Sequence, residues 1–191
     1  MGLTGGIGAG KSEALAALER LGAATLSTDA VVHELYGDPE VRDAVVARWG
    51  AEVAPAGVVD RPAVARHAFA SPEERAWLEQ LLWPRVGTRV QAWREAEAAR
   101  GARALVVETP LLFEAGMEKV YDATIAVVAD EGIRAQRAAA RGHAAVDERT
   151  ARQLSQDEKA ARADHIVRND RDLTALEQEL AGVLEKLGRT T

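Results

Sequence analysis

Apolar residues along the chain alternate between short uninterrupted runs and longer stretches with helical spacing. The runs at 104–107 and 123–128 are typical of buried parallel strands. From Lys11 to Leu21, apolar residues recur instead at the three- and four-residue spacing of one helix face. Strands are expected at 1–4, 23–26, 104–107, 123–128 and 165–167, and helices at 11–21, 29–36, 39–49, 60–69, 71–100, 130–141 and 173–187. This alternation predicts an α/β fold with a parallel sheet flanked by helices.

The stretch between the second and third expected strands contains only helical patterns. Its clearest signal is Ser71-Pro72-Glu73-Glu74, where Ser caps a helix, Pro fits the first helical position and Glu follows three residues after the cap. The helix then runs toward Arg100, and Pro84 is expected to interrupt or kink it. We therefore expect a helical excursion from the sheet.

The most specific motif lies close to the N-terminus. Residues 5–12 read Gly-Gly-Ile-Gly-Ala-Gly-Lys-Ser and fit G-x-x-x-x-G-K-S at every fixed position. Glycines let successive backbone N–H groups turn around a phosphate, and the helix that begins near Lys11 directs its positive dipole end at the same anion. Lys11 is expected to reach the β- and γ-phosphates, and the Ser12 hydroxyl to bind Mg²⁺.

Two alternative interpretations of this loop fit the residues less well. A glycine-rich turn that happens to precede a lysine would not also follow a strand and open a helix. A dinucleotide fingerprint would need glycine at position 11, which is Lys11. The chain also lacks the D-x-x-G and N-K-x-D signatures of GTPases. A small kinase that uses ATP is therefore the leading class, and a nucleotide-dependent binding protein is the alternative.

Composition and charge limit the kinds of partner, cysteine chemistry and cellular location that the chain can have. The 191 residues carry 24 Lys and Arg against 30 Asp and Glu, a net charge of −6, which argues against nucleic acid as a partner. The absence of cysteine excludes disulfides, thiolate metal sites and cysteine nucleophiles. No apolar run approaches the roughly 20 residues of a membrane span, and the N-terminus does not resemble a signal peptide. A location in the cytosol is expected.

Two acids follow expected strands, where ligands bind in open α/β sheets. Asp29 could accept the proton of an attacking hydroxyl, as a kinase base does, or could simply cap the next helix. Glu108 could hold Mg²⁺ directly or through water, or could be a solvated loop acid. The spacing alone favours neither alternative for either residue.

Further candidates lie in the second half of the chain. Residues 110–113, Pro-Leu-Leu-Phe, could be plain core or a wall of the substrate site. An arginine-rich stretch contains Arg134, Arg137, Arg141, Arg149 and Arg152. Arginines that close over a triphosphate stabilise the transition state, although any one of these could belong to a solvated helix face. The four histidines show no metal-binding spacing.

Taken together, these motifs resemble the dephospho-coenzyme A kinase family over nearly the whole chain. The resemblance is carried by the phosphate loop, Asp29 with His33, and Pro-Leu-Leu-Phe-Glu at 110–114, followed by Gln153 with Lys159 and Ala163-Asp164 with Asn169. The family transfers the γ-phosphate of ATP to the ribose 3′-hydroxyl of dephospho-coenzyme A. The remaining alternative is another P-loop small-molecule or nucleoside monophosphate kinase.

The resemblance implies a role for each motif residue. Asp29 is the implied catalytic aspartate, Lys11 acts beside it, and Arg137 and Arg141 are lid-side catalytic groups. Ser12 and Glu108 are the implied Mg²⁺ residues. ATP binding falls to Gly8, Ala9, Gly10, Lys11, Ser12, Glu13, Arg149 and Asn169, the last near the adenine. Acceptor binding falls to Asp29, His33, Pro110, Leu111, Leu112 and Phe113.

The family architecture implies one P-loop kinase domain of three parts; the sequence does not fix the oligomeric state, for which a monomer is the favoured alternative. The three parts are a nucleotide-binding core at about 1–35, 102–130 and 163–191, a helical acceptor-binding subdomain at about 36–101 and a lid at about 131–162. The chain departs from the family pattern at three places. Ser27-Thr28-Asp29 replaces the frequent Asp-x-Asp, so that only the second acid is present; Glu13 replaces a common Thr, and Trp83 a frequent His.

Overall fold

The computed structural model describes residues 1–140 and 153–188 and divides into two units. Unit 1 comprises Met1–Ser27 and Ala96–Thr191, and unit 2 comprises Thr28–Glu95. Unit 1 contains a five-stranded parallel sheet in the order β2-β3-β1-β4-β5. Its strands are β1 (Gly2–Gly5), β2 (Ala24–Ser27), β3 (Leu105–Glu108), β4 (Thr124–Val128) and β5 (His165–Arg168). The predicted α/β class with a parallel sheet is confirmed.

The register of β1, β3 and β2 brings the carboxyl ends of these strands to the same level of the sheet. All four residues of β1 are buried, and the register places Leu3 opposite Glu108 of β3. Ser27, the last residue of β2, lies opposite the same glutamate. Because parallel strands end at one edge of a sheet, the phosphate loop, Ser27 and Glu108 share that edge.

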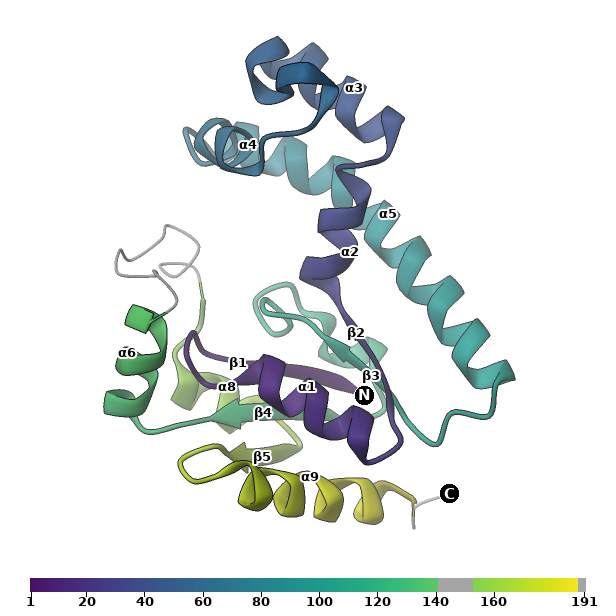
Figure 1. Cartoon of the computed structure of the whole chain (residues 1–191), viewed down its shortest axis with the longest axis vertical. Helices are drawn as coiled ribbons and strands as arrows, with labels where there is room; N and C mark the ends of the chain where they lie inside the picture. Colours follow the sequence, from purple (N-terminus) through teal and green to yellow (C-terminus); the bar gives the residue numbers. More distant parts are fainter. Residues whose placement is uncertain (141–152, 189–191) are drawn as a thin grey trace. The chain divides into compact units, whose positions relative to one another are not determined.

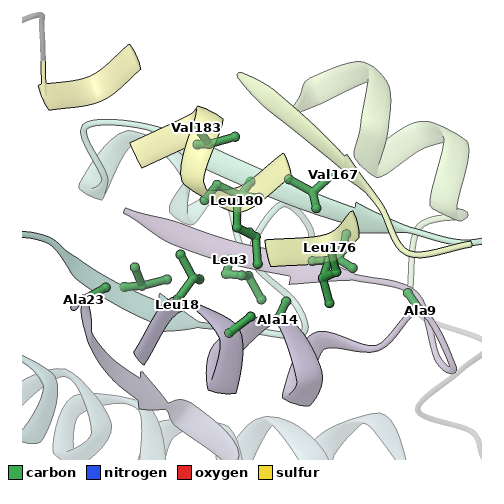
Figure 2. Packing of buried hydrophobic residues seen from close by; sticks show 13 residues of the cluster. Leu3, Ala9, Ala14, Leu18, Ala23, Val167, Leu176, Leu180 and Val183 are labelled. Carbon is green, nitrogen blue, oxygen red and sulfur yellow. The ribbon is translucent and has the colours of Figure 1, made fainter. Parts of the chain in front are cut away.

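Two helices cover one face of this sheet. Helices α1 (Lys11–Arg20) and α9 (Leu173–Gly188) pack against each other and on the strands (Figure 1). Figure 2 shows Leu3 of β1 between Leu18 of α1 and Leu180 of α9. Helix α8 (Gln156–Arg162) packs against β4 and β1. It lies on the opposite face, since its Lys159 reaches Thr4, whose side chain points away from that of Leu3.

The remaining elements of unit 1 lie in the connections between its strands. Helix α6 (Glu131–Ala140) follows β4, and the short 3₁₀ helix η3 (Met117–Val120) lies between β3 and β4. Strand β3 contains one residue more at its carboxyl end than the sequence predicts, which makes Glu108 a strand residue.

Unit 2 is helical throughout. It comprises α2 (Thr28–Leu35), α3 (Pro39–Trp49), η1 (Ala51–Val53), η2 (Pro55–Gly57), α4 (Arg61–Ala68) and most of α5 (Pro72–Ala99). A small core of Val45, Val53, Ala63 and Val64 holds α3, η1 and α4 together. Glu74 of α5 accepts hydrogen bonds from Arg48 and from the indole of Trp49 on α3.

The expected interruption at Pro84 is wrong, because α5 continues from Pro72 to Ala99. The alternative, a kink at Pro84, stays a prediction. Proline cannot donate to the carbonyl four residues earlier. The carbonyl left without its backbone donor is that of Gln80. The neighbouring Leu81 carbonyl accepts from the Arg85 guanidinium at 2.9 Å.

Asp164 ties the beginning of β5 to the beginning of β4. Its Oδ2 accepts from the Thr124 hydroxyl at 2.7 Å and from the Thr124 amide at 2.8 Å. These bonds, that from the hydroxyl foremost, lower the pKa of Asp164 below its usual value. A lowered pKa in the folded state means that the stabilisation is complete above the unfolded value near 4 and is lost as the pH falls through the folded value.

Asp164→Asn is therefore expected to destabilise the protein at pH 7 by about 1 kcal/mol, a value reduced from that of a buried charged hydrogen bond because the residue is exposed. Urea denaturation at pH 7 and pH 3 tests this. The difference from wild type should be smaller at pH 3 than at pH 7, and a constant difference would contradict the argument. Asp122→Asn is the matched control, since the described residues give this exposed acid no hydrogen bond.

Candidate active site

The phosphate loop connects β1 to α1 through residues 6–10. Gly8 and Gly10 have positive φ values of 75° and 92°, in the left-handed region that favours glycine. A Cβ atom at Gly8 would meet the backbone carbonyl of Arg134, and one at Gly10 would meet the side-chain amide of Asn169. The glycines are thus required both by the turn and by the residues that pack around it.

Lys11 and Ser12 lie at the amino end of α1. The Lys11 ammonium donates to the Gly5 carbonyl at 3.0 Å and to the Gly6 carbonyl at 3.4 Å, so its charge lies over the loop. Ser12 is exposed in the first turn of the helix. Backbone amides, a helix amino end and an ammonium group together form a site for a phosphate chain.

Glu108 is buried at the carboxyl end of β3, with 6% of its surface exposed. The Ser27 hydroxyl donates to Glu108 Oε2 at 2.6 Å from the opposite position on β2. The alternative of a solvated loop acid is therefore wrong. Ser27 stands where the family often has the first acid of Asp-x-Asp. In this chain its hydroxyl instead donates to the carboxylate of Glu108 on the neighbouring strand.

Asp29 lies in the first turn of α2, two residues beyond Ser27, and is exposed. The helix begins at Thr28, and no backbone amide in the described residues donates to the Asp29 carboxylate. The alternative that Asp29 merely caps the helix is therefore wrong. One turn later, the Arg61 guanidinium lies 2.9 Å from Nδ1 of His33. Because a guanidinium can only donate, Nδ1 is the acceptor in this hydrogen bond.

Asn169 and Arg137 line a cavity of about 600 Å³ beside the loop. Asn169 is 2% exposed, and its Nδ2 donates to the Ala9 carbonyl at 3.0 Å and to Glu13 Oε2 at 3.2 Å. Arg137 donates to the Asn169 carbonyl at 3.1 Å. The other lining residues are Glu13, Arg171, Asp172, Leu173 and Thr174. The structure thus brings together four of the predicted site regions: the loop, Glu13, Arg137 and Asn169.

Other predicted residues divide between core and surface. Leu112 and Phe113 are 0% and 2% exposed, and the guanidinium of Arg162 covers the Phe113 ring at 4.8 Å. The plain-core alternative accounts for these two residues, whereas Pro110 and Leu111 are partly exposed. Arg141, Arg149 and Arg152 lie outside the described residues.

Lys159 is a buried cation whose role the sequence did not reveal. Its side chain is 0% exposed; the ammonium pairs with Glu114 at 2.9 Å and donates to Thr4 Oγ1 and the Pro110 carbonyl. Burial lowers the pKa of Lys159, and the hydrogen-bonded Glu114 carboxylate opposes that change. This pair fastens residues 110–114 beneath β1. Lys159 and Glu114 both belonged to the family resemblance, which gave neither of them a role.

Arg134 was predicted only as one member of the arginine-rich stretch. The structure places it directly on the loop, with Nε donating to the Ile7 carbonyl at 3.0 Å. Its position three residues before Arg137 puts both side chains on one face of α6. No group of three or more His, Asp or Glu side chains arranged for a metal ion occurs in the described ranges.

A phosphate loop between a central parallel strand and a helix, with a strand-end carboxylate on the neighbouring strand, defines the chain as a P-loop kinase. The family model of dephospho-CoA kinase matches residues 1–175. The chain belongs to the dephospho-CoA kinase family, which confirms the resemblance predicted from its motifs.

Relatives and solved structures agree with this assignment. The dephospho-CoA kinase of Deinococcus radiodurans is 38% identical over 190 residues, covering 98% of this chain and 91% of that protein. The enzyme of Symbiobacterium thermophilum is 40% identical over 177 residues, covering 88% and 73%. A crystal structure from Thermus thermophilus has a TM-score of 0.78 at 34% identity, covering 97% of this chain and 96% of its own.

Membership of this family makes the chain a kinase that transfers a phosphoryl group to a hydroxyl, and implies ATP as donor and a small molecule as substrate. The predicted enzyme class is thereby confirmed. Among the described helices, none is both long and apolar enough to cross a membrane.

Proposed function

We propose that this chain transfers the γ-phosphoryl group of ATP to the ribose 3′-hydroxyl of dephospho-coenzyme A, giving coenzyme A and ADP. The observation that carries the proposal is a phosphate loop in a chain that matches the dephospho-CoA kinase family. Lys11 lies over this loop, and Ser27 holds Glu108 at the end of the neighbouring strand. We also propose that it acts in the cytoplasm as a monomer. Its net charge of −6 supports the absence of a nucleic-acid partner.

ATP binding is assigned to the loop and the cavity beside it. The amides from Gly8 to Glu13 would receive the phosphates, with Lys11 neutralising the β- and γ-groups. Asn169 and Arg137 would border the adenosine end, because both line the cavity next to Glu13. Arg141 and Arg149 stay predictions as lid-side groups that approach the triphosphate.

The residues at the strand edge fit a Mg²⁺ ion. This ion keeps several waters and needs few protein oxygens, which suits the exposed Ser12 hydroxyl and the Glu108 carboxylate. When bound, Mg²⁺ would neutralise charge that develops on the transferring phosphoryl group. Ser27 keeps Glu108 in one orientation by donating to Oε2.

Acceptor activation is assigned to Asp29. Its carboxylate is exposed, has no capping bond in the described part of the chain and follows β2 by two residues. It would take the proton of the 3′-hydroxyl as that oxygen attacks. His33 one turn later and the partly exposed Pro110 and Leu111 are the proposed acceptor contacts, and Leu112 and Phe113 would support them from the core.

The acceptor is tested by ADP release with Mg²⁺ and ATP against dephospho-coenzyme A, AMP and shikimate. We expect the highest kcat/KM with dephospho-coenzyme A, because only this compound matches the family to which the chain belongs. AMP or shikimate as the better acceptor would overturn the assignment and favour another small-molecule kinase. ATP binding without turnover of any acceptor would favour a nucleotide-dependent binding protein.

A further inference from the structure

The outward carbonyls of the phosphate loop are held by side chains from two other elements. The Ile7 carbonyl accepts from Arg134 of α6, and the Ala9 carbonyl accepts from Asn169, the residue after β5, each at 3.0 Å. A planar trans peptide points its N–H opposite to its C=O. Fixing the Ile7 carbonyl therefore fixes the Gly8 amide, and fixing the Ala9 carbonyl fixes the Gly10 amide.

Both amides belong to glycines. Gly8 and Gly10 lie in the left-handed region, which glycine adopts without steric cost, and glycine fixes its own backbone less than any other residue does. In the described part of the chain, neither amide has a hydrogen-bond acceptor. Both N–H groups thus point away from their anchors and are available to an anion.

Arg134 is fitted closely to the loop. A Cβ atom on Gly6 would lie 3.0 Å from Arg134 Nη2, and one on Gly8 would meet the Arg134 backbone carbonyl. The first turn of α6 supports this approach, since the Arg134 amide donates to the Asp130 carbonyl at 2.9 Å. Gly6 and Gly8, which stand at variable positions of the motif, therefore allow α6 to approach the loop closely.

We infer that Arg134 is a positioning residue for ATP: its Nε–H holds the Ile7 carbonyl so that the Gly8 amide is presented to the phosphates. Arg137, three residues along the same helix, donates to the Asn169 carbonyl and so supports the second anchor. Through these two arginines, helix α6 thereby helps to orient the amides of Gly8 and Gly10. This inference rests on the proposed binding of ATP at the loop.

Three substitutions separate the donor from the charge. Arg134→Gln places an amide nitrogen at the same distance along the side chain as Arg Nε, Arg134→Met removes the donor at similar length, and Arg134→Lys keeps the charge one bond further out. Calorimetric titration with ATP and with inorganic tripolyphosphate should show about tenfold weaker binding for Met and Lys, as expected for one hydrogen bond, and near-normal binding for Gln.

Several outcomes would overturn the inference. Normal binding by Arg134→Met would show that the anchor is dispensable. Normal binding by Arg134→Lys with weak binding by Arg134→Gln would assign the guanidinium charge to the phosphates themselves. Weak ATP binding with unchanged tripolyphosphate binding would place the defect at the adenosine end, and a lowered thermal midpoint of the nucleotide-free Met variant relative to the Gln variant would indicate a structural role only.

The exposed Gln136→Met on the same helix is the matched control and should bind both probes as wild type does. The binding series uses no acceptor. Failure of the wild-type protein to phosphorylate dephospho-coenzyme A would therefore overturn the proposed function and leave these affinities to decide the role of Arg134 separately.

Discussion

Lys11→Ala is expected to lower kcat/KM by about 10³-fold, which corresponds to roughly 4 kcal/mol of transition-state stabilisation. The Lys11 ammonium lies over the loop, where it donates to the carbonyls of Gly5 and Gly6. A transferring phosphoryl group carries negative charge on its equatorial oxygens. The lysine of a phosphate loop lies beside these oxygens and stabilises that charge. The loss should therefore fall on the transition state more than on the fold.

Stability and activity can be separated in this variant. Alanine is a favourable residue at the beginning of α1, so the urea midpoint should change little. Lys119→Ala is the matched control, because Lys119 is an exposed lysine of η3 in the same unit. Near-normal turnover by a folded Lys11→Ala protein would contradict the assignment of the loop, whereas equal losses in both variants would point to net charge.

The features that could be predicted from the sequence depend on short-range patterns. The glycines, Lys11 and Ser12 stand within eight consecutive residues, and their backbone requirements are fixed by local geometry. The alternation of apolar runs and helical spacing likewise predicted the α/β fold, which the parallel sheet confirms. Local signals also identified the cap Ser71, whose hydroxyl accepts from the Glu74 amide.

What could not be predicted depends on contacts between residues far apart in the chain. Ser27 and Glu108 are 81 positions apart, Arg134 and Ile7 are 127 apart, and Asn169 and Ala9 are 160 apart. No periodicity records such partners. The wrong alternative for Glu108 has the same origin, because Glu108 is buried only through its neighbours in the sheet.

Asp29→Asn is expected to lower kcat by about 10²–10⁴-fold while ATP affinity stays near wild type. The amide has the shape of the carboxylate but lacks its negative charge and cannot take the 3′-hydroxyl proton. Stability should change little, because Asp29 is exposed in the first turn of α2 and caps no amide among the described residues. The variant therefore removes a chemical group without disturbing the helix that carries it.

The neighbours of Asp29 offer no substitute for its carboxylate. Thr28 is a weak base, and the hydroxyl of Ser27 is already committed as a donor to Glu108. Glu34→Gln is the matched control, because it neutralises another exposed acid on the same helix and should leave kcat unchanged. kcat and ATP affinity are measured on the same preparation. An Asp29→Asn protein that keeps more than about a tenth of the wild-type kcat would exclude Asp29 as general base, and the role would then pass to Glu108, the buried acid at the end of β3.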